Sequence, residues 1–494
     1  MKIQSNPFLR ISIVALLGLG AAQATTYSWT GTTNGNISGT PANWGGTAPT
    51  AADIAQWNAA SYTNAPTVNA DMTLGELWFT AANTGGTTFG SGASALTLNG
   101  VGGIGIQLDI GSGAVNTGSA NFKIGASQSW LNNSASTLTV GGTITNSGNA
   151  TPYTLTLGGS GITTLTGIVS NGGTTGTLAL TKSGAGTLTL SGTNTYSGVT
   201  TISAGVLKIG NASALGSGAA SVTAGAVLDL NGTVMTGTNA LTLNGTGISS
   251  GGALINSSNT AATYAGTVTL ASASTIGSTG TGNTFTVGGN VTSTGTQNLT
   301  INAGGTQAIT LTNVNNTGTV TNSGAGAGTT IITTLGSNVT GLTEAGASSL
   351  IVTNAVGLTS SLKSFTSTGS GLFTLASQVT GVQNLTLSAN STGNITLTAG
   401  ANNGGSILNN GSGTNTVTVG AIGALVTTGV TQNAANSILL LNGAGLYTGG
   451  TTITAGTLKV GNATALGANA STVTVAGTGA VSYTHLTLPT KRIV

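Results

Sequence analysis

Two stretches of this chain are near copies of one another, and this duplication limits the folds that the chain can adopt. Residues 188–223 align without a gap with residues 439–474, at a constant offset of 251 residues. The shared positions include Gly198, Ile202, Gly205, Leu207 and Lys208, which recur as Gly449, Ile453, Gly456, Leu458 and Lys459. A chain that repeats a local pattern builds a repeat architecture, in which each unit packs on its neighbours.

Apolar residues alternate with polar ones in short runs, which predicts β-strands throughout the chain after residue 24. Leu96 and Leu98 form one such pair, and Leu188 and Leu190 another. Threonine usually fills the slot between them, since its branched side chain suits an extended backbone and its hydroxyl can face water. The sequence therefore predicts an all-β fold.

The spacing of the apolar residues predicts how the strands are arranged. Leu188, Leu207 and Leu228 recur at nearly even intervals, and a similar interval separates Ile202 from Val222. A coil of roughly 20 residues can wrap once and place each strand beside its equivalent in the previous coil. We therefore expect a right-handed parallel β-helix, or β-solenoid, over residues 136–480.

Residues 25–135 are expected to form an N-terminal cap and the first coils, because a solenoid must cover the ends of its core. All five tryptophans lie in this segment: Trp29, Trp44, Trp57, Trp78 and Trp130. Trp78 stands between Leu77 and Phe79 in an apolar strand, so core packing is the preferred interpretation. The alternative is that the aromatic cluster binds carbohydrate.

Residues 1–24 have the pattern of a secretory signal peptide. Lys2 and Arg10 precede an apolar run over residues 11–21, and Ala22-Gln23-Ala24 matches a cleavage site. We expect the mature protein to be exported and to begin at Thr25. The chain has no cysteine, so disulfide bonds do not contribute to its stability.

Residues 481–494 differ abruptly from the rest of the chain, because they contain its single histidine together with Lys491 and Arg492. This tail resembles a translated sequencing adapter, so we expect it to be non-native and the reading frame to be truncated at its C-terminal end. Without the signal peptide and the tail, five lysines face six acidic residues. The basic balance of the whole sequence is therefore no argument for a nucleic-acid partner.

The duplicated segments resemble a known repeat. Residues 180–192 read LTKSGAGTLTLSG and are followed by Asn194-Thr195-Tyr196-Ser197-Gly198 and by Thr200-Thr201-Ile202. This pattern is similar to the autotransporter-associated β-strand repeat, also called the passenger-associated transport repeat, with motifs at about residues 178–232 and 437–480. The second copy departs from the pattern at Gly445-Leu446, so its turn is expected to differ.

The resemblance implies an exported, passenger-like structural protein at the cell surface, at the outer membrane or in the extracellular space. Its repeats would assist secretion and folding and would form a rod-like stalk that can carry adhesive sites. The implied partners are the export machinery, a missing C-terminal β-barrel or anchor, and a glycan or cell-surface ligand. Neither nucleic acid nor a small-molecule cofactor is implied.

Two other classes of β-solenoid remain as alternatives: a polysaccharide-acting lyase or glycosidase, and an ice- or surface-binding protein. Solenoid enzymes need clustered carboxylates, whereas the six acidic residues here are scattered: Asp53, Asp71, Glu76, Asp109, Asp229 and Glu344. Asp71 and Glu76 form the only near pair, and both are expected to be solvated. Asp229 and Lys208 are also expected to face solvent. We assign no catalytic, cofactor-binding or metal-binding residues and expect no enzyme activity.

Overall fold

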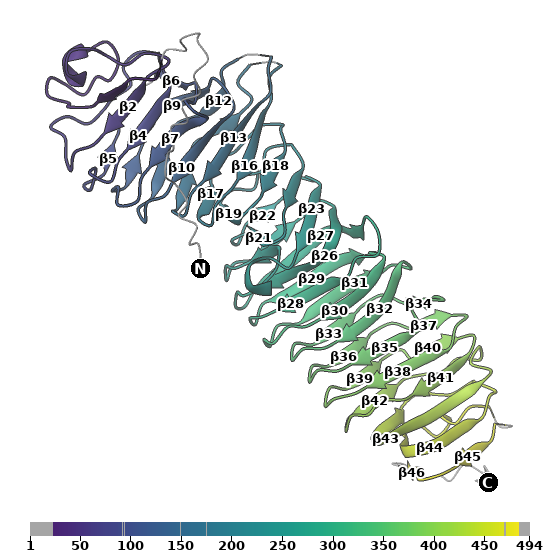
Figure 1. Cartoon of the computed structure of the whole chain (residues 1–494). Helices are drawn as coiled ribbons and strands as arrows, with labels where there is room; N and C mark the ends of the chain where they lie inside the picture. Colours follow the sequence, from purple (N-terminus) through teal and green to yellow (C-terminus); the bar gives the residue numbers. More distant parts are fainter. Residues whose placement is uncertain are drawn as a thin grey trace, which may run out of the picture.

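The computed structural model describes residues 23–483, except 91, 93, 149, 174, 469 and 470. It shows an elongated rod whose strands run across the long axis (Figure 1). Residues 1–22 of the expected signal peptide and residues 484–494 of the expected non-native tail lie outside the described residues. Within them, no helix is long and apolar enough to cross a membrane.

The rod is a parallel β-solenoid with three faces, which we name A, B and C. Strands of successive coils pair in parallel, so a strand on one face contacts the equivalent strand of the coils before and after it. The chain crosses face A, then face B, then face C, and repeats this order along the rod. The all-β parallel solenoid predicted from the sequence is confirmed, while its right-handed winding stays a prediction.

Face A is formed by β1 (Thr26–Ser28), β2 (Ile54–Trp57), β4 (Glu76–Phe79), β7 (Ile104–Leu108), β10 (Gln128–Asn132), β13 (Tyr153–Gly158), β16 (Leu178–Lys182), β18 (Thr200–Ile202), β20 (Ala220–Val222), β23 (Leu241–Gly245), the first part of β26 (Val268–Ser278) and the second part of β27 (Thr284–Ser293). The ends of β29 (Ala308–Val314) and β31 (Thr330–Leu335) continue this face, and a separate sheet of β34 (Val356–Leu358), β37 (Val379–Gly381) and β40 (Ala401–Asn403) follows.

Face B is formed by β5 (Thr87–Thr88), β8 (Val115–Asn116), β11 (Leu138–Val140), β14 (Thr163–Leu165), β17 (Thr187–Leu190), β19 (Gly205–Ile209), β21 (Ala226–Asp229), β24 (Leu254–Asn256), the second part of β26, β28 (Leu299–Ala303), β30 (Gly318–Asn322), β32 (Val339–Glu344), β35 (Ser364–Ser367), β38 (Leu385–Ala389), β41 (Ser406–Asn409), the first parts of β43 (Gly429–Leu441) and β44 (Thr451–Val460), and β45 (Val473–Val475).

Face C begins as a separate sheet of β3 (Met72–Leu74), β6 (Ala95–Leu98), β9 (Asn121–Ile124), β12 (Ile144–Asn146) and β15 (Val169–Ser170). It resumes with β22 (Val234–Met235), β25 (Ala262–Tyr264), the first parts of β27, β29 and β31, β33 (Leu350–Val352), β36 (Phe373–Leu375), β39 (Ile395–Leu397), β42 (Thr416–Val419), the second parts of β43 and β44, and β46 (Ala480–Tyr483). Two short 3₁₀-helices complete the elements: η1 (Pro41–Trp44) and η2 (Ile248–Ser250).

The length of a coil varies along the rod. Leu207 pairs with Leu228, which fits the spacing of roughly 20 residues expected for one coil. Leu77, by contrast, pairs with Ile106, a much longer step along the chain, because longer loops join the strands near the start of the rod. The coil length read from the sequence therefore holds near both duplicated segments and from β28 to β33, but not near the start of the rod.

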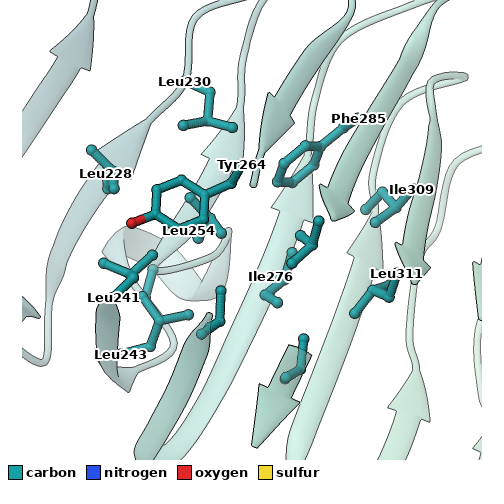
Figure 2. Packing of buried hydrophobic residues seen from close by; sticks show 14 of the residues in the cluster. Leu228, Leu230, Leu241, Leu243, Leu254, Tyr264, Ile276, Phe285, Ile309 and Leu311 are labelled. Carbon is teal, nitrogen blue, oxygen red and sulfur yellow. The ribbon is translucent and has the colours of Figure 1, made fainter. Parts of the chain in front are cut away.

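The core is a continuous column of inward-pointing side chains from all three faces. Leu228, Leu254 and Ile276 come from successive coils of face B and are fully buried. Figure 2 shows the ring of Tyr264 lying among these side chains, and its hydroxyl donates a hydrogen bond of 2.8 Å to the backbone carbonyl of Asn239. Burial of each such side chain contributes about 1.5–3 kcal/mol, and since neighbouring coils supply the contacts, stability comes from stacking.

Four of the five tryptophans lie in the core, and three of them form one aromatic cluster. The rings of Trp29 and Trp44 are 5.0 Å apart, and Trp57 stacks on Phe79 at 4.8 Å. Trp78 is different: Leu77 and Phe79 point inward and are fully buried, so the side chain between them points outward and is half-buried. The core position expected for Trp78 is wrong, because side chains alternate across a strand.

Candidate functional site

The duplicated segments form coils that share one geometry. In the first copy Leu188 pairs with Leu207, and in the second Leu439 pairs with Leu458, so the two coils have the same length. Every other pairing between strands of the described residues spans a longer stretch of chain, from Leu180–Thr200 at the short end to Leu77–Ile106 at the long end. The repeat motif is therefore the shortest coil found in the described part of the solenoid.

One of the three faces has no strand in each of these coils. A tyrosine takes the place of that strand, and the chain turns around it. Tyr196 and Tyr447 are both fully buried, and their hydroxyls lie 2.7 Å and 2.6 Å from the hydroxyls of Thr200 and Thr451. Each tyrosine ring thus fills the core, and its hydroxyl group forms a hydrogen bond with the threonine four residues further along the chain.

A second turn one coil later also has the same geometry in both copies. Asn211 accepts a hydrogen bond from the backbone N–H of Ser213, and Asn462 accepts one from Thr464, both at 2.9 Å. The N–H of Ser217 then reaches back to the carbonyl of Tyr196 at 2.9 Å, as that of Ala468 does to Tyr447. The shared residues therefore specify a closed pair of turns around each tyrosine.

The two copies differ where the sequence departs from the pattern. Asn194 accepts a hydrogen bond from the N–H of Val169 at 2.8 Å and donates one to the carbonyl of Ala214 at 2.6 Å, so it links three successive coils. Gly445 in the second copy has no side chain to do this, and Leu446 beside it is 64% exposed. The backbone keeps its path, since the N–H of Leu446 donates to Ile422 as that of Thr195 donates to Val169, so the copies differ here in side-chain contacts.

A polar side chain points into the corner of the coil that leads into each repeat. The ammonium group of Lys182 donates to the carbonyls of Ser183, Gly184 and Ala204 at 2.6–3.1 Å, and burial lowers its pKa to about 8. Gln432 has the same place in the second copy, where it donates to Ala434 at 3.1 Å and Ser437 at 2.9 Å. The corner needs a donor for its carbonyls, and two chemically different side chains supply it.

The duplicated segments do not occupy the same faces of the rod. Ile202 of the first copy lies on face A. Its counterpart Ile453 lies on face B, in the same stack of strands as Leu207. The face without a strand is accordingly face C in the first copy and face A in the second. The motif is thus a local unit that can start on different faces of the rod.

The acidic residues expected to be solvated behave differently from one another. Asp71 is exposed and lies 3.2 Å from Lys123, whereas Glu76 is 1% exposed because the turn of the next coil crosses the start of β4. Asp229 is also buried: its carboxylate accepts hydrogen bonds from Asn231 and Ser257, and Lys208 lies 3.9 Å away. The solvent exposure expected for Glu76 and Asp229 is wrong.

The carboxylates of Asp53, Asp71, Asp109, Asp229 and Glu344 each have hydrogen-bond or ion-pair partners of their own. An open depression of about 540 Å³ lies beside Asp71, and small or uncharged residues such as Asn36, Ser38 and Thr73 line the rest of it. Over the residues that the structure describes, no three His, Cys, Asp or Glu side chains are grouped so that they could hold a metal ion. The duplicated coils are therefore the strongest candidate for a functional unit.

Comparison with known families supports this choice. Residues 180–209 and 437–460 match the family model described as the passenger-associated-transport-repeat. No curated protein and no solved structure matches the chain. Both matched segments lie in the two shortest coils and their lead-in strands, and repeats of this kind are structural parts of autotransporter passengers that imply export to the cell surface or the extracellular space. The chain is therefore a β-solenoid that carries two passenger-associated transport repeats and fits the stalk of an autotransporter passenger.

Proposed function

We propose that the two repeat coils assist the export and folding of this chain, and that the rest of the solenoid is a stalk that holds adhesive sites away from the cell. The observation that carries the proposal is the shortest coil, which occurs in both repeats and in no other pair of strands described. A short coil with its turns fixed around a buried tyrosine needs the fewest residues to close. It can therefore form early as the chain emerges and offer both strand edges to the next coil.

The composition of the chain also supports this role. It has no cysteine and only 15 charged residues in 494, so it can cross a membrane extended without reduction of disulfides or desolvation of many charges. Coils that stack only on their neighbours can fold one after another as they emerge. Each coil added outside the cell would then hinder backward movement. Residues 25–135, with their aromatic cluster, are proposed to cap the outer end.

Deletion of single coils tests the role of the repeats. Removal of residues 188–206 places Leu207 where Leu188 was, and removal of residues 439–457 does the same with Leu458 and Leu439. We expect either deletion to lower the surface-exposed fraction several-fold when the chain is produced with an autotransporter translocator. The measurement is protease accessibility on intact cells, normalised to total protein.

The matched control removes residues 365–386, a coil outside the repeats in which Leu387 takes the place of Phe365. It shortens the rod by one coil and should leave the exposed fraction close to that of the parent. Equal losses from all three deletions would mean that any coil contributes alike, and the proposed role of the repeats would be wrong.

A further inference from the structure

Trp78 is unusual among the tryptophans of this chain. The other four are at most 4% exposed, whereas Trp78 is half-buried on the outer surface of face A. Its neighbours in the sheet are Gln56 in the coil before and Gln107 in the coil after. An indole ring at the surface offers a large contact area with one polar edge, which is why tryptophan is enriched at binding surfaces.

The ring of Trp78 is held in place by a polar network. Its Nε1–H donates a hydrogen bond of 2.8 Å to one carboxylate oxygen of Asp109, and Gln107 donates one of 2.6 Å to the other. On the opposite side, Asn58 donates to the side-chain carbonyl of Gln56 at 3.0 Å. Both edges of the platform are thus fixed, and a ligand that packs on the ring would not have to order it first.

The chemistry of this surface indicates what it can bind. A flat apolar ring lies between two amide side chains, and Asp109 is the one charged group in the network, with both of its oxygens already engaged. Sugars carry apolar C–H groups on the faces of the ring and hydroxyls around its edge. Such a ring can pack on an indole while its hydroxyls reach the neighbouring amides. An anionic ligand would be repelled by the carboxylate of Asp109.

We propose that Trp78, with Gln56 and Gln107, forms a binding site for a neutral carbohydrate near the start of the rod. The site names a ligand class for the adhesive part of the proposed function, on which its biological use rests. Binding itself depends on neither export nor the repeats, so it is measured on the purified chain. A failure of this proposal is therefore distinct from a failure of the export proposal.

The test is retention of the purified full chain on immobilised cellulose, xylan, mannan, curdlan and starch, followed by titration of tryptophan fluorescence with the matching oligosaccharide. We expect saturable binding to at least one polymer. Trp78→Ala should weaken it at least tenfold, and Trp78→Phe less, because a smaller aromatic face remains. Gln107→Ala should also weaken it, since the variant loses an amide and frees Asp109.

Val382→Ala is the matched control, since Val382 is an apolar side chain that is 79% exposed elsewhere on the rod. It should bind like the parent, and circular dichroism should show that every variant has the parent's fold. Absence of binding to all five polymers, or equal binding by Trp78→Ala, would overturn the proposal. Binding to a charged polymer such as alginate or to a protein, but to no neutral polymer, would overturn it as well.

Discussion

Glu344 is a carboxyl group whose charge the fold disfavours. It lies at the end of β32, has no exposed surface, and accepts hydrogen bonds of 2.5 Å from Asn322 and 2.7 Å from the N–H of Gly346. Ser367 stacks on it from the next coil. Burial raises the pKa of Glu344 from 4.5 to about 7, although both hydrogen bonds favour the charged form. None of these neighbours can titrate or neutralise the carboxylate.

This raised pKa makes stability depend on pH. The folded chain binds the proton of Glu344 more tightly than the unfolded chain, so its contribution is full below about pH 4.5 and is lost as the pH rises to about 7. The free energy of unfolding should fall by about 3 kcal/mol across this window. Glu344→Gln should remove most of that fall, as measured by denaturant unfolding between pH 4 and pH 8.

The control for this prediction is Asp71→Asn, which changes an exposed carboxyl group. Hydrogen bonds from Ala95 and Lys123 lower the pKa of Asp71, so the group titrates below the window and the fall should persist in this variant. A parent protein whose stability is constant from pH 4 to pH 8 would contradict the prediction.

At the scale of the element, the tight turn between β18 and β19 is one corner of the first repeat coil. Gly205 has a φ of +67°, and a Cβ there would lie 2.5 Å from the carbonyl oxygens of Gly184 and Gly186 in the previous coil. Its counterpart Gly456 has a φ of +78°, and a Cβ there would lie 1.9 Å from the carbonyl oxygen of Ala434. Only glycine allows two coils to approach so closely at this corner.

Gly205→Ala should therefore destabilise the chain by more than the left-handed backbone alone would explain. Gly225→Ala is the control, since Gly225 has a φ of +83° but nothing within 4 Å of the added Cβ. We expect Gly225→Ala to cost about 1 kcal/mol, the usual penalty for this conformation, and Gly205→Ala to cost at least twice that. Thermal unfolding of the two variants decides it, and equal costs would show that backbone conformation alone matters.

At the scale of the whole molecule, the rod should behave as a row of units that interact with their neighbours. Phe365 and Phe373 are fully buried, with ring centroids 6.0 Å apart, and their contacts come from adjacent coils. Phe365→Ala should cost about 3–5 kcal/mol locally. Hydrogen exchange should accelerate in β32, β35 and β38, while β10 to β20 keep the rate of the parent. The reason is that each coil of a solenoid is stabilised only by contacts with its neighbours.

Phe122→Ala is the reciprocal variant, since Phe122 is fully buried near the other end of the rod and its ring lies 5.3 Å from that of Trp130. It should accelerate exchange in β7 to β13 and leave β32 to β38 unchanged. If either substitution accelerated exchange uniformly along the rod, the solenoid would unfold as one cooperative unit and the description by neighbours would be wrong.

The failed expectations for Asp229 and Glu76 share one cause. Alternation along a strand correctly placed Leu207 and Leu228 in the core, but it also placed Asp229 and Glu76 in solvent. Both side chains are covered by the chain of a neighbouring coil, at Ser257 in one case and near residue 100 in the other. Whether a loop crosses a given strand end depends on the length of the next coil, and that length differs between the start of the rod and the repeats.

The sequence by itself determined the fold class and the repeat, because both depend on local patterns. Period-two alternation specifies strands, and a regular spacing of apolar residues, one coil apart, specifies stacking of like on like. Only the tertiary structure decided which face each copy occupies and that Glu76, Asp229 and Glu344 are buried. These outcomes depend on the summed lengths of all the coils between two points and on how adjacent coils cover one another. No local pattern carries that information.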